Sequence, residues 1–230
     1  MATKPGHLAL YLDAPLQSWG YQSKFDRRTT LSYPTRSGIM GMLCAALGYE
    51  RDDMVSLASL ARLRMQVLVF QQQSRMTDFH TVGGGWDKKV HPRNVVRKAD
   101  GKPGSTVVTH REYLESARFG VVLSGDREQL AIIADALKNP RWGIWLGRKA
   151  CVPASPVFQG LFDTHEDAAR HLSYVATTEG RQHHVCVTKR VVHEVDTFED
   201  GTDTLMDVPL DFAHRTFAPR RVAVDIPEKE

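Results

Sequence analysis

The chain has 230 residues, of which 42% are hydrophobic and 25% are charged, the mixture of a folded, soluble protein with one large domain or two small ones. Its net charge of +3 and pI of about 8.8 do not by themselves identify a partner. The first segment, MATKPGHLALYLDAP, holds no apolar run long enough for a signal peptide or membrane span. The three cysteines are widely spaced with no C-x-x-C pair, which argues against a disulfide framework and favours a reducing cytoplasm.

Hydrophobic spacing predicts regular elements in the first third of the chain. Apolar residues recur at helical spacing from Ile39 to Leu47, after start signals at Pro34, Thr35 or Ser37 and before Gly48, which is placed to end a helix. The other elements predicted up to residue 70 are a strand over His7–Asp13, a polar, aromatic and basic loop over Gln17–Arg36, a short helix over Asp52–Leu63 and a strand over Arg64–Phe70.

An irregular, basic insert follows over Gln71–Arg111. It contains the breakers Gly83-Gly84-Gly85 and Gly101-Lys102-Pro103-Gly104. Eight positive and three negative side chains give this segment a charge of 8 − 3 = +5, against +3 for the whole chain. Because structureless inserts of this length are uncommon in compact domains, we expect a binding loop or an extended hairpin.

Regular patterning resumes after the insert. The predicted elements are a strand over Ala117–Ser124, an amphipathic helix over Asp126–Lys138, a loop over Arg141–Gly160 that ends in a strand, a short helix over His165–Leu172, a strand over Gln182–Arg190 and turn-rich, strand-like pieces to the end.

The order of these elements predicts the fold class. Up to residue 160 it is β-α-β-β-α-β, the ferredoxin-like arrangement of an α+β protein, with helices on one face of an antiparallel sheet and the other face open. RNA-recognition domains use this scaffold and bind RNA on the open face, although fold alone does not establish function. We expect a domain over 1–162 with the insert at about 71–111, and a small, mainly β region over 163–230.

The sequence lacks the common metal and cofactor motifs. No Lys-Ser or Lys-Thr follows Gly83–Gly85, as a phosphate loop would require, and His184 and Cys186 have no second ligand pair for zinc. Asp196–Asp207 fails the calcium-loop pattern at two ligand positions. We therefore expect no metal and no cofactor. Metal-independent RNA cleavage stays open, because one histidine with a Tyr or Lys can suffice.

Three clusters combine positive charge with aromatic side chains, as single-stranded nucleic acid requires. Each alone is compatible with core packing and solvated arginines, but three together with a basic insert favour RNA binding. The first ends at a helix start, where N–H groups favour a phosphate, and we expect the first and third to converge. The clusters comprise Trp19, Tyr21, Lys24, Phe25, Arg27, Arg28, Tyr33 and Arg36; the insert around Trp86; and Trp142, Trp145, Arg148 and Lys149.

Several motifs carry a family resemblance across residues 8 to about 162. The run APLQSWG over Ala14–Gly20, followed by YPTRSGIMGMLCAALGYERDD over Tyr33–Asp53, resembles the CasD family, the RAMP-type subunit of type I-E CRISPR Cascade. DFHTV, HREYL and RWGIWLGRKACVPASPVFQG match in the same order. The sequence departs from the family at TVGGGW, and the C-terminal part matches only loosely.

The resemblance implies a non-catalytic subunit that binds and caps the 5′ handle of the CRISPR RNA, with the insert as a β-hairpin thumb. It implies contacts with a CasC-like backbone subunit and a CasA-like large subunit, with target DNA only through the complex, and with no membrane. The alternatives are a metal-independent endoribonuclease, as in type I-C systems, using His80 or His110, and a pure scaffold. The expected RNA-binding residues are Gln17, Trp19, Arg27, Arg36, Ser37, His80, Lys88, Lys89, Arg93, Arg111, Trp145, Arg148 and Lys149.

Overall fold

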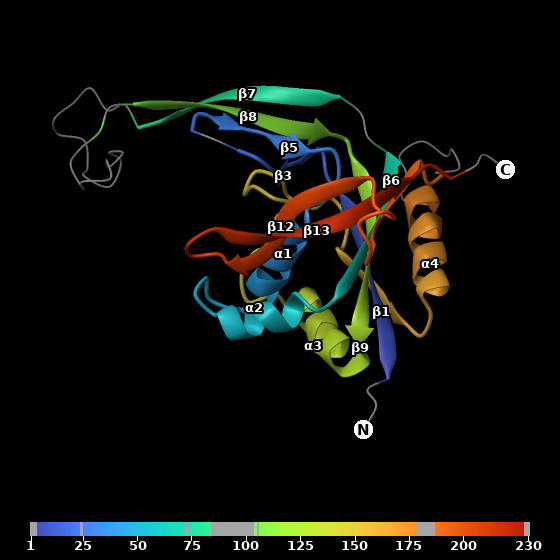
Figure 1. Cartoon of the computed structure of the whole chain (residues 1–230). Coiled ribbons are helices and arrows are strands. Elements are labelled where there is room, and N and C mark those ends of the chain that lie inside the picture. Colours follow the sequence, from blue (N-terminus) through green and yellow to red (C-terminus); the bar gives the residue numbers. More distant parts are fainter. Residues whose placement is uncertain are drawn as a thin grey trace.

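The computed structural model describes residues 4–23, 25–71, 74–83, 104, 106–178 and 187–227. Within these ranges the chain forms a seven-stranded antiparallel sheet, a four-stranded sheet and a two-stranded ribbon, together with four helices (Figure 1). No helix in the described part is long and apolar enough to cross a membrane.

The predicted order of elements is confirmed in the first two thirds of the chain. It is β1 (Pro5–Asp13), α1 (Arg36–Leu47), β6 (Arg64–Gln71), β9 (Arg118–Asp126), α3 (Arg127–Lys138) and β10 (Phe158–Phe162). In the large sheet these strands lie in the order β10-β1-β9-β6, and every neighbouring pair is antiparallel. Helix α2 (Met54–Leu60) is shorter than the helix predicted over Asp52–Leu63, and Asp53 is its N-cap.

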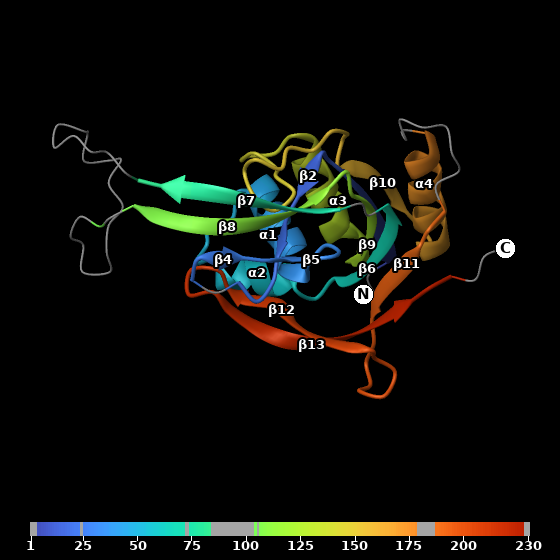
Figure 2. The ribbon, with the colours of Figure 1, turned by 90° about the horizontal axis from the view of Figure 1, so that it is seen from above.

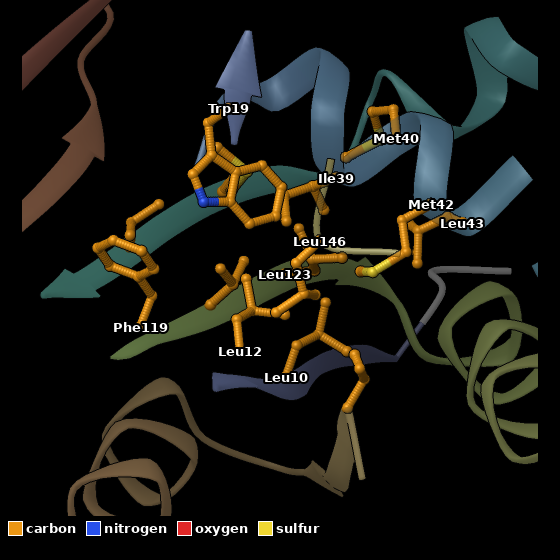
Figure 3. Close-up of a cluster of buried hydrophobic side chains, with 14 of the residues drawn as sticks. Leu10, Leu12, Trp19, Ile39, Met40, Met42, Leu43, Phe119, Leu123 and Leu146 are labelled. Atoms are coloured by element: carbon orange, nitrogen blue, oxygen red, sulfur yellow. The ribbon is translucent and has the colours of Figure 1, made fainter. Parts of the chain in front are cut away.

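Helix α1 begins and ends where the sequence signals place it. The Thr35 side chain accepts a hydrogen bond from the Gly38 N–H, and Gly48 adopts a left-handed conformation after the last turn. Its buried face packs on alternate residues of β1, including Leu10 and Leu12, in the main hydrophobic core (Figure 3). The Trp19 ring lies over the start of this helix, where a Cβ on Gly38 would come within 2.8 Å of it.

A fourth helix, α4 (His165–Thr178), covers the opposite face of the sheet. Leu172 and neighbouring apolar residues of α4 pack on Tyr11 and Phe70, the side chains that point away from α1 and α3. The prediction that one face of the sheet is left open is therefore wrong for this chain. The strands indicate the reason, because β1 and β6 are apolar at successive positions rather than at alternate ones.

The C-terminal region continues the same sheet. Strand β11 (Arg190–Glu194) pairs with β6, and β13 (Thr216–Asp225) and β12 (Asp203–Asp211) extend the sheet from there. Of the strand predicted over 182–190, residues 182–186 lie outside the described residues, and β11 begins only at Arg190. The domain boundary expected after residue 162 therefore lies within one continuous sheet, and the main hydrophobic core contains residues from both sides of it.

The described ends of the insert form an antiparallel hairpin, β7 (Arg75–Val82) and β8 (Val107–Glu115), which extends away from the large sheet (Figure 2). Strand β8 also pairs with β2 (Leu16–Gln17) and with β4 (Arg27–Arg28). The ribbon consists of β3 (Trp19–Gly20) and β5 (Thr30–Leu31). The predicted RNA-binding residues Lys88, Lys89 and Arg93 lie outside the described residues.

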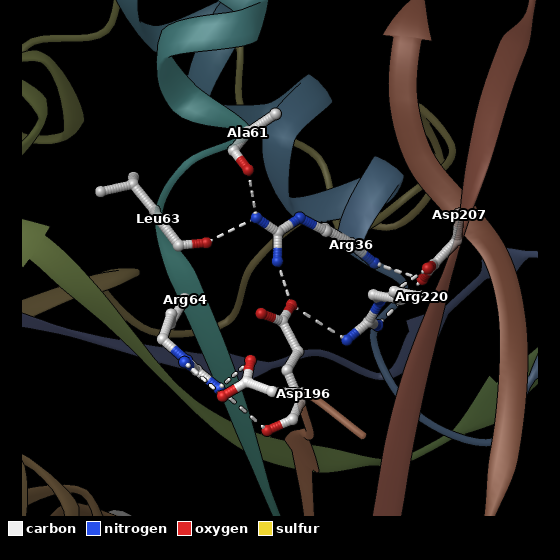
Figure 4. Close-up of polar contacts among 8 residues, drawn as sticks. Arg36, Ala61, Leu63, Arg64, Asp196, Asp207 and Arg220 are labelled. Atoms are coloured by element: carbon white, nitrogen blue, oxygen red, sulfur yellow. Dashed lines mark hydrogen bonds and ion pairs between the residues drawn. The ribbon is translucent and has the colours of Figure 1, made fainter. Parts of the chain in front are cut away.

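A buried charge network joins the C-terminal strands to the first helix (Figure 4). The Arg36 side chain is 5% exposed; it forms an ion pair with Glu194 and donates to the carbonyls of Ala61 and Leu63, at 2.6 Å each. Arg220 contacts Glu194 at 3.2 Å and Asp207 at 2.7 Å. Two cations and two anions therefore compensate one another where desolvation would otherwise be costly.

This network corrects the prediction for Arg36. Its guanidinium is engaged inside the protein, so it is not available to bind a phosphate. The expected anion at the start of α1 is the Asp207 carboxylate, which accepts a hydrogen bond from the Arg36 N–H at 2.7 Å and is itself buried. Ser37, the other residue predicted there, is half-buried, and its hydroxyl donates to Thr35 Oγ1 at 3.4 Å.

The Arg36–Glu194 and Arg64–Asp196 ion pairs of Figure 4 differ in exposure, and this difference yields a prediction. We expect Arg36→Ala to lower the free energy of unfolding by about 3–5 kcal/mol, because it leaves Glu194 buried with one cation fewer. The matched control is Arg64→Ala, which breaks the exposed pair with Asp196 at 3.2 Å and is expected to cost less than about 1 kcal/mol. Urea denaturation of both variants measures this; equal losses would contradict it.

Candidate nucleic-acid interface

Strand β8 organises the surface on which the predicted RNA-binding residues meet. One of its edges pairs with β7, and its other edge pairs with β2 near Leu114 and with β4 near His110. Arg28 of β4 is the register partner of Arg111 on β8. Two cations separated by more than eighty positions in the sequence thus become neighbours.

The loop after α3 is held against this surface by backbone hydrogen bonds. The Ser18 N–H donates to the Leu146 carbonyl at 3.1 Å, and the Trp142 N–H donates to the Ala45 carbonyl at the end of α1, also at 3.1 Å. Further along, the Ala154 N–H donates to the Asp13 carbonyl at 2.8 Å. The loop is therefore fixed to α1, to the end of β1 and to the segment between β2 and β3.

Gly147 lies at the closest approach in this loop. Its φ is +101°, and a Cβ there would be 1.7 Å from the Ser18 carbonyl oxygen. Because any side chain would displace the backbone, glycine allows Arg148 to reach β8.

Arg148 connects the loop to the strands. Its guanidinium donates to the carbonyls of Arg28 and Glu112, each at 2.8 Å, and lies over the Tyr113 ring at 4.6 Å from the centroid. The first and third clusters of the sequence therefore converge as predicted. Since its donors are partly engaged, Arg148 positions the loop and also adds positive charge beside Arg28 and Arg111.

Several of the predicted RNA-binding residues on the loop, β4 and β8 have exposed polar or aromatic surface. Trp145 and Lys149 are exposed on the loop, Arg27 is exposed on β4, and Arg111 is half-buried on β8. Guanidinium and ammonium groups bind phosphates, and an exposed indole offers a face for an unpaired base. The described surface thus has the components of a single-strand interface.

Gln17 and Trp19 have a different role from the predicted one. Both side chains are fully buried. The Gln17 amide donates to the carbonyls of Leu12 and Ala117 at 3.0 and 2.7 Å, and the Trp19 indole N–H donates to Gln17 Oε1 at 3.1 Å. They therefore fix the end of β1 and the position of β2 and β3. The prediction that these two side chains contact RNA directly is corrected accordingly, because inside the protein they position the strands instead.

Phe79 was missed by the sequence reasoning. It is 64% exposed on β7 and packs edge to face with His110, with ring centroids 5.5 Å apart. Arg27 is the register partner of His110 on the next strand. The alternation of DFHTV could have indicated this, because it places the aromatic ring on the face opposite His80.

Two histidines of this surface lie near carboxylates. His80 lies 3.8 Å from Asp78, and His110 lies 3.9 Å from Asp26. Burial raises the pKa of the Cys151 thiol in the loop, so the thiol stays protonated at neutral pH and packs as a small apolar group. Among the described residues, no three His, Cys, Asp or Glu side chains converge as a metal site would require.

Comparison with known proteins assigns the fold to a family. A family model described as CRISPR-associated protein (Cas_Cas5) matches residues 7–223. The CRISPR system Cascade subunit CasD of Escherichia coli (strain K12) is 32% identical over 180 residues, covering 73% of this chain and 76% of that protein.

Solved structures agree with the sequence match. A chain from a CRISPR RNA-guided surveillance complex superposes with a TM-score of 0.74 at 33% identity, covering 96% of this chain and 89% of that one. A second structure, described as a Cas protein, gives a TM-score of 0.65 at 32% identity, covering 96% and 94%. The fold and these matches define a CRISPR-associated protein. More narrowly, the chain belongs to the Cas5 family, and the resemblance to CasD that its motifs carry is confirmed.

The close approach at Gly147 yields a second prediction. We expect Gly147→Ala to lower the free energy of unfolding by about 2 kcal/mol or more, because the methyl group clashes with the Ser18 carbonyl and the backbone conformation disfavours a side chain. Gly20→Ala is the matched control, since a Cβ there has no heavy atom within 4 Å, and it should cause no loss. Urea denaturation compares the two; a Gly147 variant as stable as the Gly20 variant would show that the loop is not pinned there.

Proposed function

We propose that this chain is a subunit of a CRISPR RNA-guided surveillance complex and binds the 5′ handle of the CRISPR RNA. The observation that carries the proposal is the convergence of Arg28, Arg111 and Arg148 on one surface, beside the exposed Trp145 and Lys149. Single-stranded RNA is bound by such combinations of phosphate-neutralising and stacking groups. The similarity to CasD and to a chain of a surveillance complex supports the assignment.

The scaffold that presents this surface is, in this proposal, a ferredoxin-like core with a thumb. The core consists of β1, α1, β6, β9, α3 and β10, whose strands lie in the order β10-β1-β9-β6. The thumb is the β7–β8 hairpin inserted between β6 and β9. Because α4 covers the second face of the sheet, the handle binds at the hairpin and loop rather than across the sheet face.

The proposed partners follow from membership of such a complex. Besides the CRISPR RNA handle, they are a CasC-like backbone subunit and a CasA-like large subunit. Target DNA is recognised only through the complex, since pairing with the guide supplies the sequence specificity.

We also propose that the chain does not cut RNA. His80 pairs in register with Thr109, and His110 pairs with Phe79, so the two imidazoles project from opposite faces of the hairpin. They therefore cannot act together on one phosphodiester. Tyr113, the nearest tyrosine along β8, is buried beneath Arg148, which supports a binding role over an acid–base role.

The cationic surface predicts salt-dependent binding of handle RNA. Replacing both Arg111 and Lys149 with alanine should make the plot of log K against log salt concentration less steep by about 1.5–2 units. Each phosphate contact that is lost means that fewer counterions are released on binding, which lowers the slope by about 0.7–1 unit. Fluorescence anisotropy with labelled handle RNA across a salt series measures the slope.

The control for this measurement is Arg170→Ala on the outer side of α4, where Arg170 is exposed and paired with Asp167 at 2.7 Å. This variant should keep the wild-type slope. If the Arg111/Lys149 variant keeps it as well, the surface does not track the RNA backbone.

The lack of a convergent acid–base pair among the described residues of the hairpin predicts no cleavage. Repeat RNA incubated with the purified protein should remain intact on a denaturing gel, with or without divalent metal. Specific cutting at the handle boundary that is lost in His80→Ala or in His110→Ala would instead establish the endoribonuclease alternative.

A further inference from the structure

The four-stranded sheet has one covered face and one open face. Successive side chains of a strand point to opposite faces of its sheet. On the covered face, Thr109 and Tyr113 of β8 are each 5% exposed. On the other face, every second residue of β7 is exposed, namely Arg75, Thr77, Phe79 and Thr81. The small sheet therefore has the open face that the large sheet lacks.

Three side chains of the open face form a row across neighbouring strands. Strands β7, β8 and β4 lie side by side (Figure 2), and His110 is the register partner of both Phe79 and Arg27. The Phe79 ring is 64% exposed and contacts the His110 ring, and both His110 and Arg27 are exposed. The cross-strand row of Phe79, His110 and Arg27 thus presents a phenyl ring, an imidazole and a guanidinium to solvent.

The chemistry of this row matches that of single-stranded RNA. Unpaired bases stack on aromatic rings, on histidine and on the guanidinium plane of arginine. RNA-recognition domains carry such side chains on the strands of a four-stranded sheet, where they stack two or three bases. Among the described residues, the Arg27 guanidinium has no carboxylate partner, so its charge is available to a phosphate.

The loop before β4 is held in a strained conformation beside the row. Gln22 and Phe25 have φ values of 51° and 50°, which residues other than glycine rarely adopt. The loop is fixed to β8 at the next position, because the Asp26 carbonyl accepts the His110 N–H at 2.8 Å. Phe25 is 87% exposed. Strain of this kind persists only where the surrounding structure holds it, and it gathers at binding sites.

We propose that the cross-strand row stacks unpaired bases of the CRISPR RNA handle, on the face of the hairpin opposite Arg111. This rests on the proposed function, because it extends the same interface. Arg27 and Arg28 are consecutive in β4, as His110 and Arg111 are in β8. Since consecutive residues point to opposite faces, the RNA passes around the edge of the two-residue strand β4, with one guanidinium on each side.

The surroundings of the row favour RNA over a protein partner. Protein interfaces have an apolar core inside a polar rim, and interfaces between two copies of one chain are more apolar still. The neighbours of Phe79 on its face of β7 are Thr77 and Thr81, both exposed. One phenyl ring among hydroxyl groups, an imidazole and a guanidinium lacks such an apolar core, but it suits a stacked base with its phosphate.

A fluorescent base analogue tests the stacking. Handle RNA with 2-aminopurine at one position at a time should be quenched at one to three positions when it binds the full chain, because stacking quenches this base. Phe79→Leu should restore the fluorescence at saturating protein and weaken binding about tenfold, the contribution of one stacked base. The matched control is Phe198→Leu, since Phe198 is 68% exposed on the C-terminal loop beneath Arg221. It should change neither quantity.

A double-mutant cycle separates stacking from a structural effect. Handle RNA that is abasic at a quenched position should bind the wild-type chain about tenfold more weakly, and it should bind Phe79→Leu no more weakly than intact RNA does. The salt slope of Phe79→Leu should equal that of the wild type, because stacking neutralises no phosphate. A variant with a damaged hairpin would instead lose affinity equally for both RNAs, which would overturn the proposal.

The other outcomes each assign the face differently. Quenching that persists in Phe79→Leu overturns the stacking role. So does a dimer of the chain that Phe79→Leu abolishes, or the loss of one protein subunit from Phe79→Leu complexes at unchanged RNA affinity. If the wild-type chain binds no handle RNA, the proposed function itself fails. Salt-dependent binding without quenching at any position overturns only the stacking by the cross-strand row.

Discussion

The compensation of Arg36 by buried acids is the interaction on which the arrangement of the chain depends. One guanidinium contacts the connection between α2 and β6 and also Glu194 on β11, and Arg220 shares Glu194 while binding Asp207 on β12. Because none of these charges has water to replace a lost partner, the C-terminal strands must stay in register with the start of α1. This constraint holds the C-terminal region, which the sequence suggested was separate, against the core.

A second buried polar group positions the candidate interface. Gln17 accepts the Trp19 indole N–H and bridges the end of β1 to the residue before β9. Trp19 in turn rests on Gly38 at the start of α1. The residues of the most distinctive family motifs are therefore interior ones. In the proposed function they serve RNA binding through position, by setting where β2, β4 and the Gly147 loop meet β8, while the cations that face outward lie elsewhere in the chain.

Strand β8 supports the surface that we propose for RNA binding. One of its edges gathers Arg28, Arg148 and the loop after α3, and its other edge supports β7. A single hairpin ladder therefore holds the backbone of the candidate interface in fixed register.

The sequence by itself determined the order and type of the elements, the caps of α1 and the motifs of the Cas5 family, because these depend on local spacing and on short-range hydrogen bonds. It also contained the sign that both sheet faces are covered, in the continuous apolar runs of β1 and β6. Only the tertiary structure decided that Gln17, Trp19 and Arg36 point inward and that Arg148 meets Arg28. These outcomes depend on contacts between residues a hundred or more positions apart, such as Gln17 with Ala117 and Arg36 with Asp207. Local residue type does not encode such contacts, since the same arginine or tryptophan suits a buried network as well as a bound RNA.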